Sequence, residues 1–390
     1  MPMFSTLKQK YKRRFELFKQ TNHFCSVPWN LLYVNMTGEI YSCTNGNYQL
    51  GDLKTNSMEE IIGNAERKKI KEYIIKDKKT KNCKNCLKLE NLQESKKYNH
   101  LRGMYNNLFK KNDIDYDDTN SFTLGGLDLH WSSVCNLKCV TCWAGQSSLI
   151  AKEQGLPVQH TPPEAAAKLI DWVENNQDNL REVYLSGGEP TYINYNLDLL
   201  KKLEKRPDLL IRVNSNMMWE KNNKILSEIL KFPNVLFTCS ADSIDKKFEY
   251  IRRGAKWDKF VDNINFLQSQ KNVKVRINLV FFVLNGTSIT DIIDFFHDNI
   301  GVRDFTINQC QMGHTYLRCR NLPDESKKKA KENLLAAKEK YSHDLNLVGQ
   351  FTNCLNELEN DKSENYNNYL NHIDNIAGSN WKNVFWDLSL

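Results

Sequence analysis

From residue 127 onward, short apolar runs alternate with longer stretches in which apolar residues recur every three or four positions. The short runs predict buried strands, and the longer stretches predict amphipathic helices. Six strands are expected, at 127–132, 182–188, 210–216, 235–242, 273–283 and 304–310. Helical stretches separate them, for example 164–176, 196–205, 223–232, 256–270 and 289–300. Six repeats of strand and helix predict an α/β fold in which helices lie outside a parallel sheet.

The part of the chain before residue 127 has a different pattern. Two short runs, 31–36 and 39–43, are joined by a Thr-Gly turn and predict a β-hairpin. Ser57 and Glu60 have the spacing of a capping box, which predicts a helix that begins near Met58 and continues toward residue 76. The N-terminal region is therefore expected to be a small α+β domain.

The two ends of the chain add two further expectations. Residues 1–20 combine basic residues with apolar residues at helical spacing, which indicates a basic amphipathic helix. A polar stretch at 111–126 marks a domain boundary, and the Lys-rich helix and late aromatics of the C-terminus are expected to dock on the sheet or close its open edge. Three parts are expected, at 1–115, 116–320 and 321–390.

Composition and charge narrow the classes of partner. The net charge is +7 over 390 residues, and Lys-rich stretches at 65–84 and 326–340 carry part of the excess as solvated helix faces, so a nucleic-acid partner is the lesser alternative. The longest apolar run, 279–284, is too short to span a bilayer, and the basic N-terminus lacks an apolar signal region. We expect a cytoplasmic protein with no membrane partner, whose 11 cysteines bind metal rather than form disulfides.

Three of the cysteines follow the first strand of the repeating region. Cys135, Cys139 and Cys142 have the spacing C-x3-C-x2-C. Three thiolates on one tight loop can bind three irons of a four-iron cluster and leave the fourth iron open to a ligand. The alternative is a zinc knuckle, but no fourth Cys or His lies close by on the C-terminal side.

A second motif ends the next strand. Gly187 and Gly188 allow a ligand to approach the backbone closely, and the carboxylate of Glu189 can pair with an ammonium group. The cysteine triplet followed by this motif resembles the radical S-adenosylmethionine (SAM) superfamily. The resemblance implies a partial (β/α)6 barrel like a shortened TIM barrel, with chemistry at the carboxyl ends of the strands.

The same resemblance implies roles for residues that end the later strands. SAM is expected to bind the open iron of a 4Fe–4S cluster held by the triplet, with its amino group at the Gly-Gly-Glu motif. The hydroxyls of Ser215 and Ser240 are expected to contact the methionine carboxylate, Asn278 is expected to contact the ribose, and Asp242 is expected to belong to the same SAM site. Arg253 is a further candidate for the carboxylate. For each of these, a strand-end cap, a turn residue or a solvent-exposed side chain is the alternative.

Four earlier cysteines form a second set. Cys25, Cys43, Cys83 and Cys86 follow the pattern C-x17-C-x39-C-x2-C. This resembles the twitch domain, a shortened relative of the SPASM domain, and implies an auxiliary 4Fe–4S cluster. A zinc ribbon is the alternative, although zinc ribbons usually show two C-x2-C pairs. The expected cofactors are therefore SAM and two 4Fe–4S clusters.

The expected function is that of a radical SAM enzyme. It would cleave SAM reductively to a 5′-deoxyadenosyl radical and abstract hydrogen from a peptide or protein side chain or a small metabolite. The auxiliary cluster favours net oxidation, with flavodoxin or ferredoxin as electron donor. The alternatives are a redox-neutral epimerase of a carbohydrate or peptide, with Cys310 as hydrogen-atom donor, and a non-catalytic iron–sulfur or zinc protein.

Overall fold

The computed structural model describes residues 24–46, 48–78, 83, 86, 101–109, 114–310, 314–362 and 364–386. The helix expected at residues 1–20 lies outside these described residues. The chain divides into two compact units. The first comprises Met1–Ser133, Gln159–Arg212 and Lys231–Asn234, and the second comprises Val134–Val158, Val213–Leu230 and Val235–Leu390. The first unit includes residues on both sides of the boundary expected near residue 115, which stays a prediction.

The first unit contains a sheet with the strand order β3-β2-β1-β4-β5. Its strands are β1 (Leu31–Val34), β2 (Glu39–Tyr41), β3 (Gln49–Asp52), β4 (Gly126–Leu129) and β5 (Glu182–Leu185). The expected hairpin is present as the antiparallel pair β1–β2, and β3 extends it. The sequence pattern did not predict that β1 also pairs in parallel with β4, so the hairpin and the first strand of the repeating region share one sheet.

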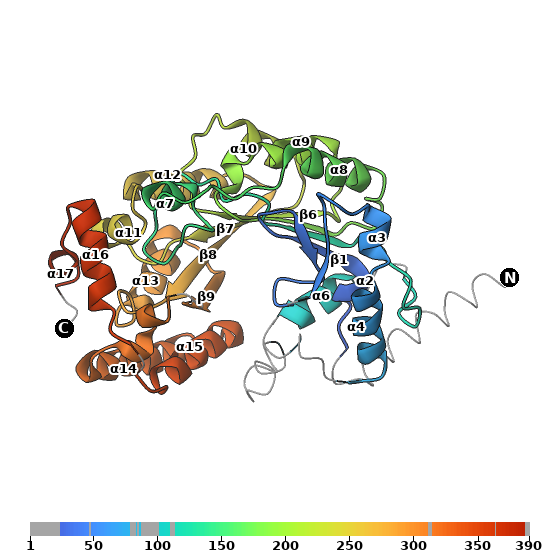
Figure 1. Cartoon of the computed structure of the whole chain (residues 1–390). Coiled ribbons are helices and arrows are strands. Elements are labelled where there is room, and N and C mark those ends of the chain that lie inside the picture. The colour runs from blue at the N-terminus through green and yellow to red at the C-terminus, as the bar shows by residue number, and fades with distance from the viewer. Residues whose placement is uncertain are drawn as a thin grey trace. The chain divides into compact units, whose positions relative to one another are not determined.

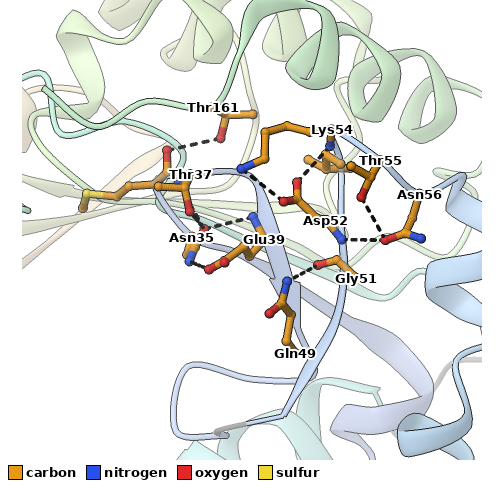
Figure 2. Close-up of polar contacts among 12 residues, drawn as sticks. Asn35, Thr37, Glu39, Gln49, Gly51, Asp52, Lys54, Thr55, Asn56 and Thr161 are labelled. Atoms are coloured by element: carbon orange, nitrogen blue, oxygen red, sulfur yellow. Dashed lines mark hydrogen bonds and ion pairs between the residues drawn. The ribbon is translucent and has the colours of Figure 1, made fainter. Parts of the chain in front are cut away.

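A compact hydrogen-bond network fixes the hairpin turn (Figure 2). The Asn35 Oδ1 accepts bonds from the backbone N–H groups of Thr37 and Glu39, both at 3.0 Å. Gly38 has a φ of +90°, a conformation that side-chain-bearing residues rarely adopt. The Asn35 side chain therefore stabilises the turn by accepting its N–H groups, and Gly38 allows the positive φ that the turn requires.

The helices of the first unit are α2 (Val27–Asn30), α3 (Met58–Ile62), α4 (Ala65–Ile75), α6 (Leu101–Phe109), α8 (Pro163–Glu174), η3 (Pro190–Tyr192) and α9 (Asn194–Lys202). The capping box of Ser57 and Glu60 is present in full. The single helix expected up to residue 76 is wrong, because α3 stops at Gly63 and the Asn64 side chain caps a new helix. Asn64 accepts bonds from two N–H groups of α4, which satisfies donors that a helix start leaves open.

The second unit contains the parallel strands β7 (Val235–Ser240), β8 (Val273–Phe281) and β9 (Phe305–Gln309), in that order. The strand β6 (Leu210–Ser215) is divided between the two units after Arg212. From β4 to β9 each strand is followed by at least one helix. The expected fold class, a partial (β/α)6 barrel with a small N-terminal α+β region and helices at the C-terminus, is confirmed.

The helices of the second unit are α7 (Ser148–Glu153), α10 (Lys224–Ile229), α11 (Asp245–Ile251), α12 (Trp257–Gln268), α13 (Ile289–Phe295), η4 (Phe296–Ile300), η5 (Thr315–Leu317), η6 (Cys319–Asn321), α14 (Asp324–Lys340), α15 (Leu345–Leu358), α16 (Asn367–Ala377) and α17 (Trp381–Val384). At the C-terminal end, α14 packs on α15, α15 packs on β9, and α17 packs on α11 (Figure 1). The C-terminal helices thus dock on the last strand and outer helices of this unit, as expected. Within the part of the chain that is described, no helix is both long and apolar enough to cross a membrane.

Two buried cations on α4 stand out in the first unit. Arg67 and Lys71 are both fully buried. Burial lowers the pKa of Arg67 to about 9. The pKa of Lys71 is lowered to about 7, mainly by burial and secondly by the positive charge of Arg67. The Lys71 Nζ donates to the carbonyl oxygens of Thr119 at 3.2 Å and Ser121 at 2.6 Å. These bonds fix the segment that leads into β4, at the expense of desolvating an ammonium group.

The burial of Lys71 makes stability depend on pH. A lysine in an unfolded chain titrates near about 10.4. Between the folded and unfolded pKa values the unfolded chain binds more protons, so the folded state gains stability as the pH rises. From pH 7 to pH 9, the free energy of unfolding should rise on the order of 2 kcal/mol more in the wild type than in Lys71→Met. Anaerobic urea denaturation at both pH values measures this.

The matched control is Lys69→Met, because Lys69 lies on the same helix and its side chain is 57% exposed. This variant should follow the wild type at both pH values. A constant difference in unfolding free energy between the wild type and Lys71→Met across this range would contradict the prediction.

Candidate active site

The cysteine loop of the second unit is held in place by the start of α7. The Ser148 hydroxyl accepts a bond from the Cys135 N–H at 3.1 Å and donates to the Cys135 carbonyl at 3.2 Å. The Ser147 hydroxyl donates to another loop carbonyl at 2.7 Å, and the Cys142 N–H donates to the Cys139 carbonyl at 3.0 Å. These short-range bonds keep Cys135, Cys139 and Cys142 on one tight loop, as their spacing predicts.

The three thiols of this loop lie close enough to affect one another's charge. Burial raises the pKa of Cys142, and negative charge on Cys139 or Cys135 raises it further. Burial also raises the pKa of Cys139, while the nearby Arg252 opposes that rise. Crowded thiols in a buried position keep their protons unless a bound cation replaces them. This donor set suits iron, for which thiolate sulfur is a preferred ligand.

Arg252 is a residue of this site that the sequence did not reveal. Its Nη2 lies 2.7 Å from the Asp242 Oδ2, its Nε donates to the Ala241 carbonyl at 3.1 Å, and its Nη1 lies 3.8 Å from the Cys139 sulfur. The other oxygen of Asp242 accepts the Val280 N–H at 2.7 Å. Arg252 and Asp242 therefore link the cysteine loop to the ends of β7 and β8.

The neighbouring arginine lies in a different environment. The Arg253 Nη2 is 3.0 Å from Glu153 Oε1, and the same oxygen lies 2.6 Å from the Lys138 Nζ. Arg253 thus belongs to a local ion-pair group between the cysteine loop and α7. Its role toward the methionine carboxylate stays a prediction, and Arg252 is the arginine that contacts the cysteine loop through Cys139.

The end of β6 contributes two adjacent polar residues. The Ser215 hydroxyl accepts the N–H of Met217, whose φ is +66°. The Asn216 Nδ2 donates to the Asn136 Oδ1 at 2.8 Å and lies 3.8 Å from the Cys135 sulfur. Ser215 caps the end of its strand, as the alternative interpretation of this residue expected. Its contact with SAM stays a prediction. Asn216 was noted in the sequence only as part of a motif, yet it contacts the cysteine loop.

Ser240 and Asn278 face the same edge from β7 and β8. They are register partners in the parallel ladder, and the Ser240 hydroxyl donates to the Asn214 Oδ1 at 3.5 Å. The Asn278 Oδ1 accepts a bond from the Asn308 Nδ2 at 2.7 Å. Because the carboxyl ends of parallel strands meet at one edge, these polar side chains form a row that can hydrogen-bond a ligand there.

The Gly-Gly-Glu motif lies in the first unit. A Cβ at Gly187, whose φ is +105°, would meet the Ser132 carbonyl at 2.7 Å, and the Gly188 N–H donates to that carbonyl at 2.9 Å. Glu189 is fully buried, and its Oε1 accepts bonds from the Thr191 hydroxyl at 2.8 Å and the Thr191 N–H at 3.3 Å. Only glycine fits at position 187, and the Glu189 carboxylate is held in one orientation, so the motif suits an ammonium group.

The second cysteine set also converges, within the first unit. Burial raises the pKa of Cys25, with the charge of Cys83 as the next cause, and Cys43 and Cys86 add to it. Burial raises the pKa of Cys43 to about 12, and Cys86 and Cys83 raise it as well. The Asn45 Nδ2 lies 3.8 Å from the Cys86 sulfur. All four expected ligands of the auxiliary cluster therefore lie within electrostatic reach of one another.

The described residues contain no group of three His, Cys, Asp or Glu side chains gathered around one point as for a single metal ion. A four-iron cluster does not need such a group, because each thiolate binds a different iron.

Cys310 follows β9 and is buried. Its sulfur lies 3.6 Å from the His314 carbonyl, and it raises the pKa values of Tyr316 and Tyr369, for both of which burial is the larger cause. Nothing in these contacts marks it as a hydrogen-atom donor, and that role stays a prediction.

Two converging cysteine sets in an α/β fold are typical of an iron–sulfur protein. The radical SAM superfamily model matches residues 129–299, and the model of an iron–sulfur cluster-binding domain, SPASM, matches residues 25–87. Residues 129–299 are thus a radical SAM domain and residues 25–87 an iron–sulfur cluster-binding domain, and the cofactors are SAM and 4Fe–4S clusters. No curated protein matches the chain.

Solved structures with a similar trace include SuiB of Streptococcus suis bound to SAM, at 17% identity and a TM-score of 0.38, covering 54% of this chain and 43% of that chain. Native anSMEcpe with bound AdoMet is 18% identical, with a TM-score of 0.43, and 57% of this chain and 62% of that chain are covered. TYW1 with a lysine–pyruvate adduct is 16% identical, with a TM-score of 0.33 and coverage of 56% and 71%. The chain spans less than two thirds of the length of the first two.

The Arg252–Asp242 pair should be strongly coupled. Arg252→Met leaves a buried carboxylate without its cation, so unfolding free energy should fall by about 3–5 kcal/mol. The double variant Arg252→Met/Asp242→Asn should lose less than the single arginine variant, because it removes the unpaired charge. Anaerobic denaturation of the four forms of this mutant cycle measures the coupling.

Arg253→Met is the control for this cycle, since Glu153 retains Lys138 at 2.6 Å when Arg253 is removed. It should cost clearly less than Arg252→Met. Strict additivity of the Arg252 and Asp242 substitutions would show that the pair is not coupled.

Proposed function

We propose that the chain cleaves SAM reductively, uses the resulting radical to abstract hydrogen from its substrate, and completes a net oxidation with the auxiliary cluster as electron acceptor. The observation that carries this proposal is the contrast between the two cysteine sets. One set offers three converging thiols and the other offers four. A three-ligand set leaves one iron open for SAM, whereas a four-ligand set leaves none and suits electron transfer.

When bound, the SAM-ligating cluster supplies the electron that breaks a carbon–sulfur bond of SAM. The protein's part is to bind and orient. Glu189 pairs with the amino group, Gly187 and Gly188 leave room for it, and Ser215 and Ser240 hydrogen-bond the carboxylate. Asn278 hydrogen-bonds the ribose. Asp242 acts here mainly by holding Arg252, the cation that lies beside Cys139.

The substrate proposed is a peptide or protein side chain, with a small metabolite as the second possibility. Flavodoxin or ferredoxin serves as electron donor, and the protein acts in the cytoplasm. Three functional parts are proposed, at 1–115, 116–320 and 321–390. Redox-neutral epimerisation is the weaker candidate, because the thiol of Cys310 is buried and directed at the His314 carbonyl.

Counting iron and sulfide on anaerobically reconstituted protein tests the two cysteine sets. The wild type should hold about eight irons. The triple variant of Cys135, Cys139 and Cys142 to Ala should hold about four irons, and so should the quadruple variant of Cys25, Cys43, Cys83 and Cys86 to Ala. Electron paramagnetic resonance of the reduced samples should show a different cluster signal in each variant. SAM should perturb only the signal that the triple variant loses.

A wild-type count of about four irons, unchanged in the quadruple variant, would leave the N-terminal cysteines without a cluster. The zinc reading of that region would then lead, and the electron-acceptor role would be withdrawn.

SAM cleavage tests the Gly-Gly-Glu motif separately. Glu189→Gln should raise the Kd for SAM by roughly 10-fold or more, because a charge-assisted bond to the ammonium group is lost. Equilibrium binding and 5′-deoxyadenosine release under dithionite measure this. Glu164→Gln, an exposed glutamate on α8, is the control and should bind SAM as the wild type does. Equal affinity in Glu189→Gln would remove the motif from the SAM site.

A further inference from the structure

The sheet of the first unit has two chemically different faces. On β1, β4 and β5 the residues that point to one side are fully buried and aliphatic, namely Leu32, Val34, Leu127, Leu129, Val183 and Leu185. The residues that alternate with them include Tyr33, Asp128 and Tyr184, which are register partners across the three strands. Tyr41 of β2 pairs with Tyr33 and extends the row. The two faces of this sheet therefore differ chemically, one aliphatic and the other polar and aromatic, and buried polar groups on the second face need partners.

At the end of this row, the positive charge of Arg212 is balanced by the negative charge of Glu182. The Arg212 guanidinium lies over the Tyr184 ring at 3.7 Å and pairs with the buried carboxylate of Glu182. Burial raises the pKa values of Tyr33 and Tyr184, so both phenols stay protonated at neutral pH and remain hydrogen-bond donors. The row therefore offers phenolic donors and no uncompensated cation.

His130 stands on the same face, two residues beyond Asp128. Its Nε2 lies 3.0 Å from the Asp128 Oδ1, an ion-pair contact, and neither atom has a hydrogen-bond partner among the described residues. The imidazole sits edge-on between two rings, with centroid distances of 5.1 Å to Tyr33 and 6.0 Å to Tyr184. The His130 N–H donates to the Val34 carbonyl at 2.8 Å, which fixes the backbone of the dyad.

The exposure of the two side chains is unequal. The Asp128 side chain is 2% exposed, whereas the His130 side chain is 18% exposed although its Nε2 is buried. The imidazole is therefore the accessible member of the pair, and Asp128 is the buried one. A buried carboxylate behind a partly open imidazole is the arrangement that orients a histidine as a general base. It also lies at the carboxyl end of β4, the edge where barrel enzymes carry their chemistry.

We propose that His130 is the catalytic base of the oxidation and that Asp128 is its positioning residue. This rests on the proposed function. The substrate is one whose reacting carbon carries an O–H or N–H group. That carbon loses a hydrogen atom to the deoxyadenosyl radical, the O–H or N–H proton goes to His130 Nδ1, and one electron leaves to the iron–sulfur acceptor. The carbon–oxygen or carbon–nitrogen single bond becomes a double bond, and the hydrogen atom, the proton and the electron that are lost account for the oxidation.

Titratable and charged groups on four neighbouring elements face the dyad. Tyr33 comes from β1, Tyr184 and Glu182 from β5, and Arg212 from β6. Tyr105 of α6 also lies within the electrostatic reach of Asp128. Burial raises the pKa of Tyr105 too. Asp128 is the carboxylate that lies in direct contact with His130.

Diethyl pyrocarbonate is the probe, because it acylates an accessible unprotonated imidazole nitrogen and needs neither SAM nor a cluster. Full-length protein is treated at pH 7.5, and the modified histidines are mapped by mass spectrometry. His130 should be acylated in the wild type, and Asp128→Asn should slow this by at least about threefold, because the neutral amide does not hold the imidazole as the carboxylate does. Asp298→Asn is the matched control, since Asp298 pairs with His297 at 2.6 Å on the surface. It should alter only His297.

A second measurement covers the case in which Asp128→Asn does not fold. Nitrogen-15 spectra of histidine-labelled wild type, assigned with His130→Gln, should show His130 as the Nε2–H tautomer with an unprotonated Nδ1. An unreactive His130, an unchanged rate in a folded Asp128→Asn, or the opposite tautomer would each overturn the proposal. Failure of the proposed function would appear elsewhere, as missing iron or missing deoxyadenosine.

Discussion

Thiolates cannot be gathered in a buried position unless a cation joins them, and this constraint applies twice in the chain. Burial and neighbouring thiols raise the pKa values of Cys25, Cys43 and Cys142 together. The protein therefore holds two sets of cysteines whose thiolate form is unfavourable until iron binds. Cluster insertion and folding are coupled in such a case, because the binding free energy also stabilises the fold. Ser147 and Ser148 hold the triplet loop by hydrogen bonds. The positive charge of Arg252 favours the thiolate form of Cys139.

The sequence was sufficient to predict those elements whose positions depend on short-range patterns of residues. Alternation of apolar runs placed the strands from β4 to β9 within a few residues, and the spacing of Ser57 and Glu60 placed the start of α3. The break between α3 and α4 was missed because Asn64 is ordinary within a helical pattern, and only its cap bonds distinguish it. The parallel pairing of β1 with β4 was missed because it joins strands about 90 residues apart, and no short-range signal encodes it.

The same limit applies to the site. Cysteines and the Gly-Gly-Glu motif are visible because their chemistry depends on spacing. Arg252 and Arg253 are adjacent in sequence, and only the structure shows that the first contacts Cys139 and the second pairs with Glu153. Asp128 and His130 lie in a run that reads as an apolar strand, so their contact depends on strand alternation and on the tyrosines of neighbouring strands. Pairwise contacts across a sheet are not encoded in any one segment.

The parallel bond between β1 and β4 also bears on how this architecture can be cut or rearranged. Leu31 to Val34 hydrogen-bond along the whole length of Gly126 to Leu129. A chain shortened to begin after the hairpin would leave β4 with an unpaired row of N–H and C=O groups beside an aliphatic face. Such an open edge invites pairing with other chains and aggregation. The β1–β2 hairpin thus protects the edge of the sheet, so gene fusions or truncations that remove it would threaten solubility.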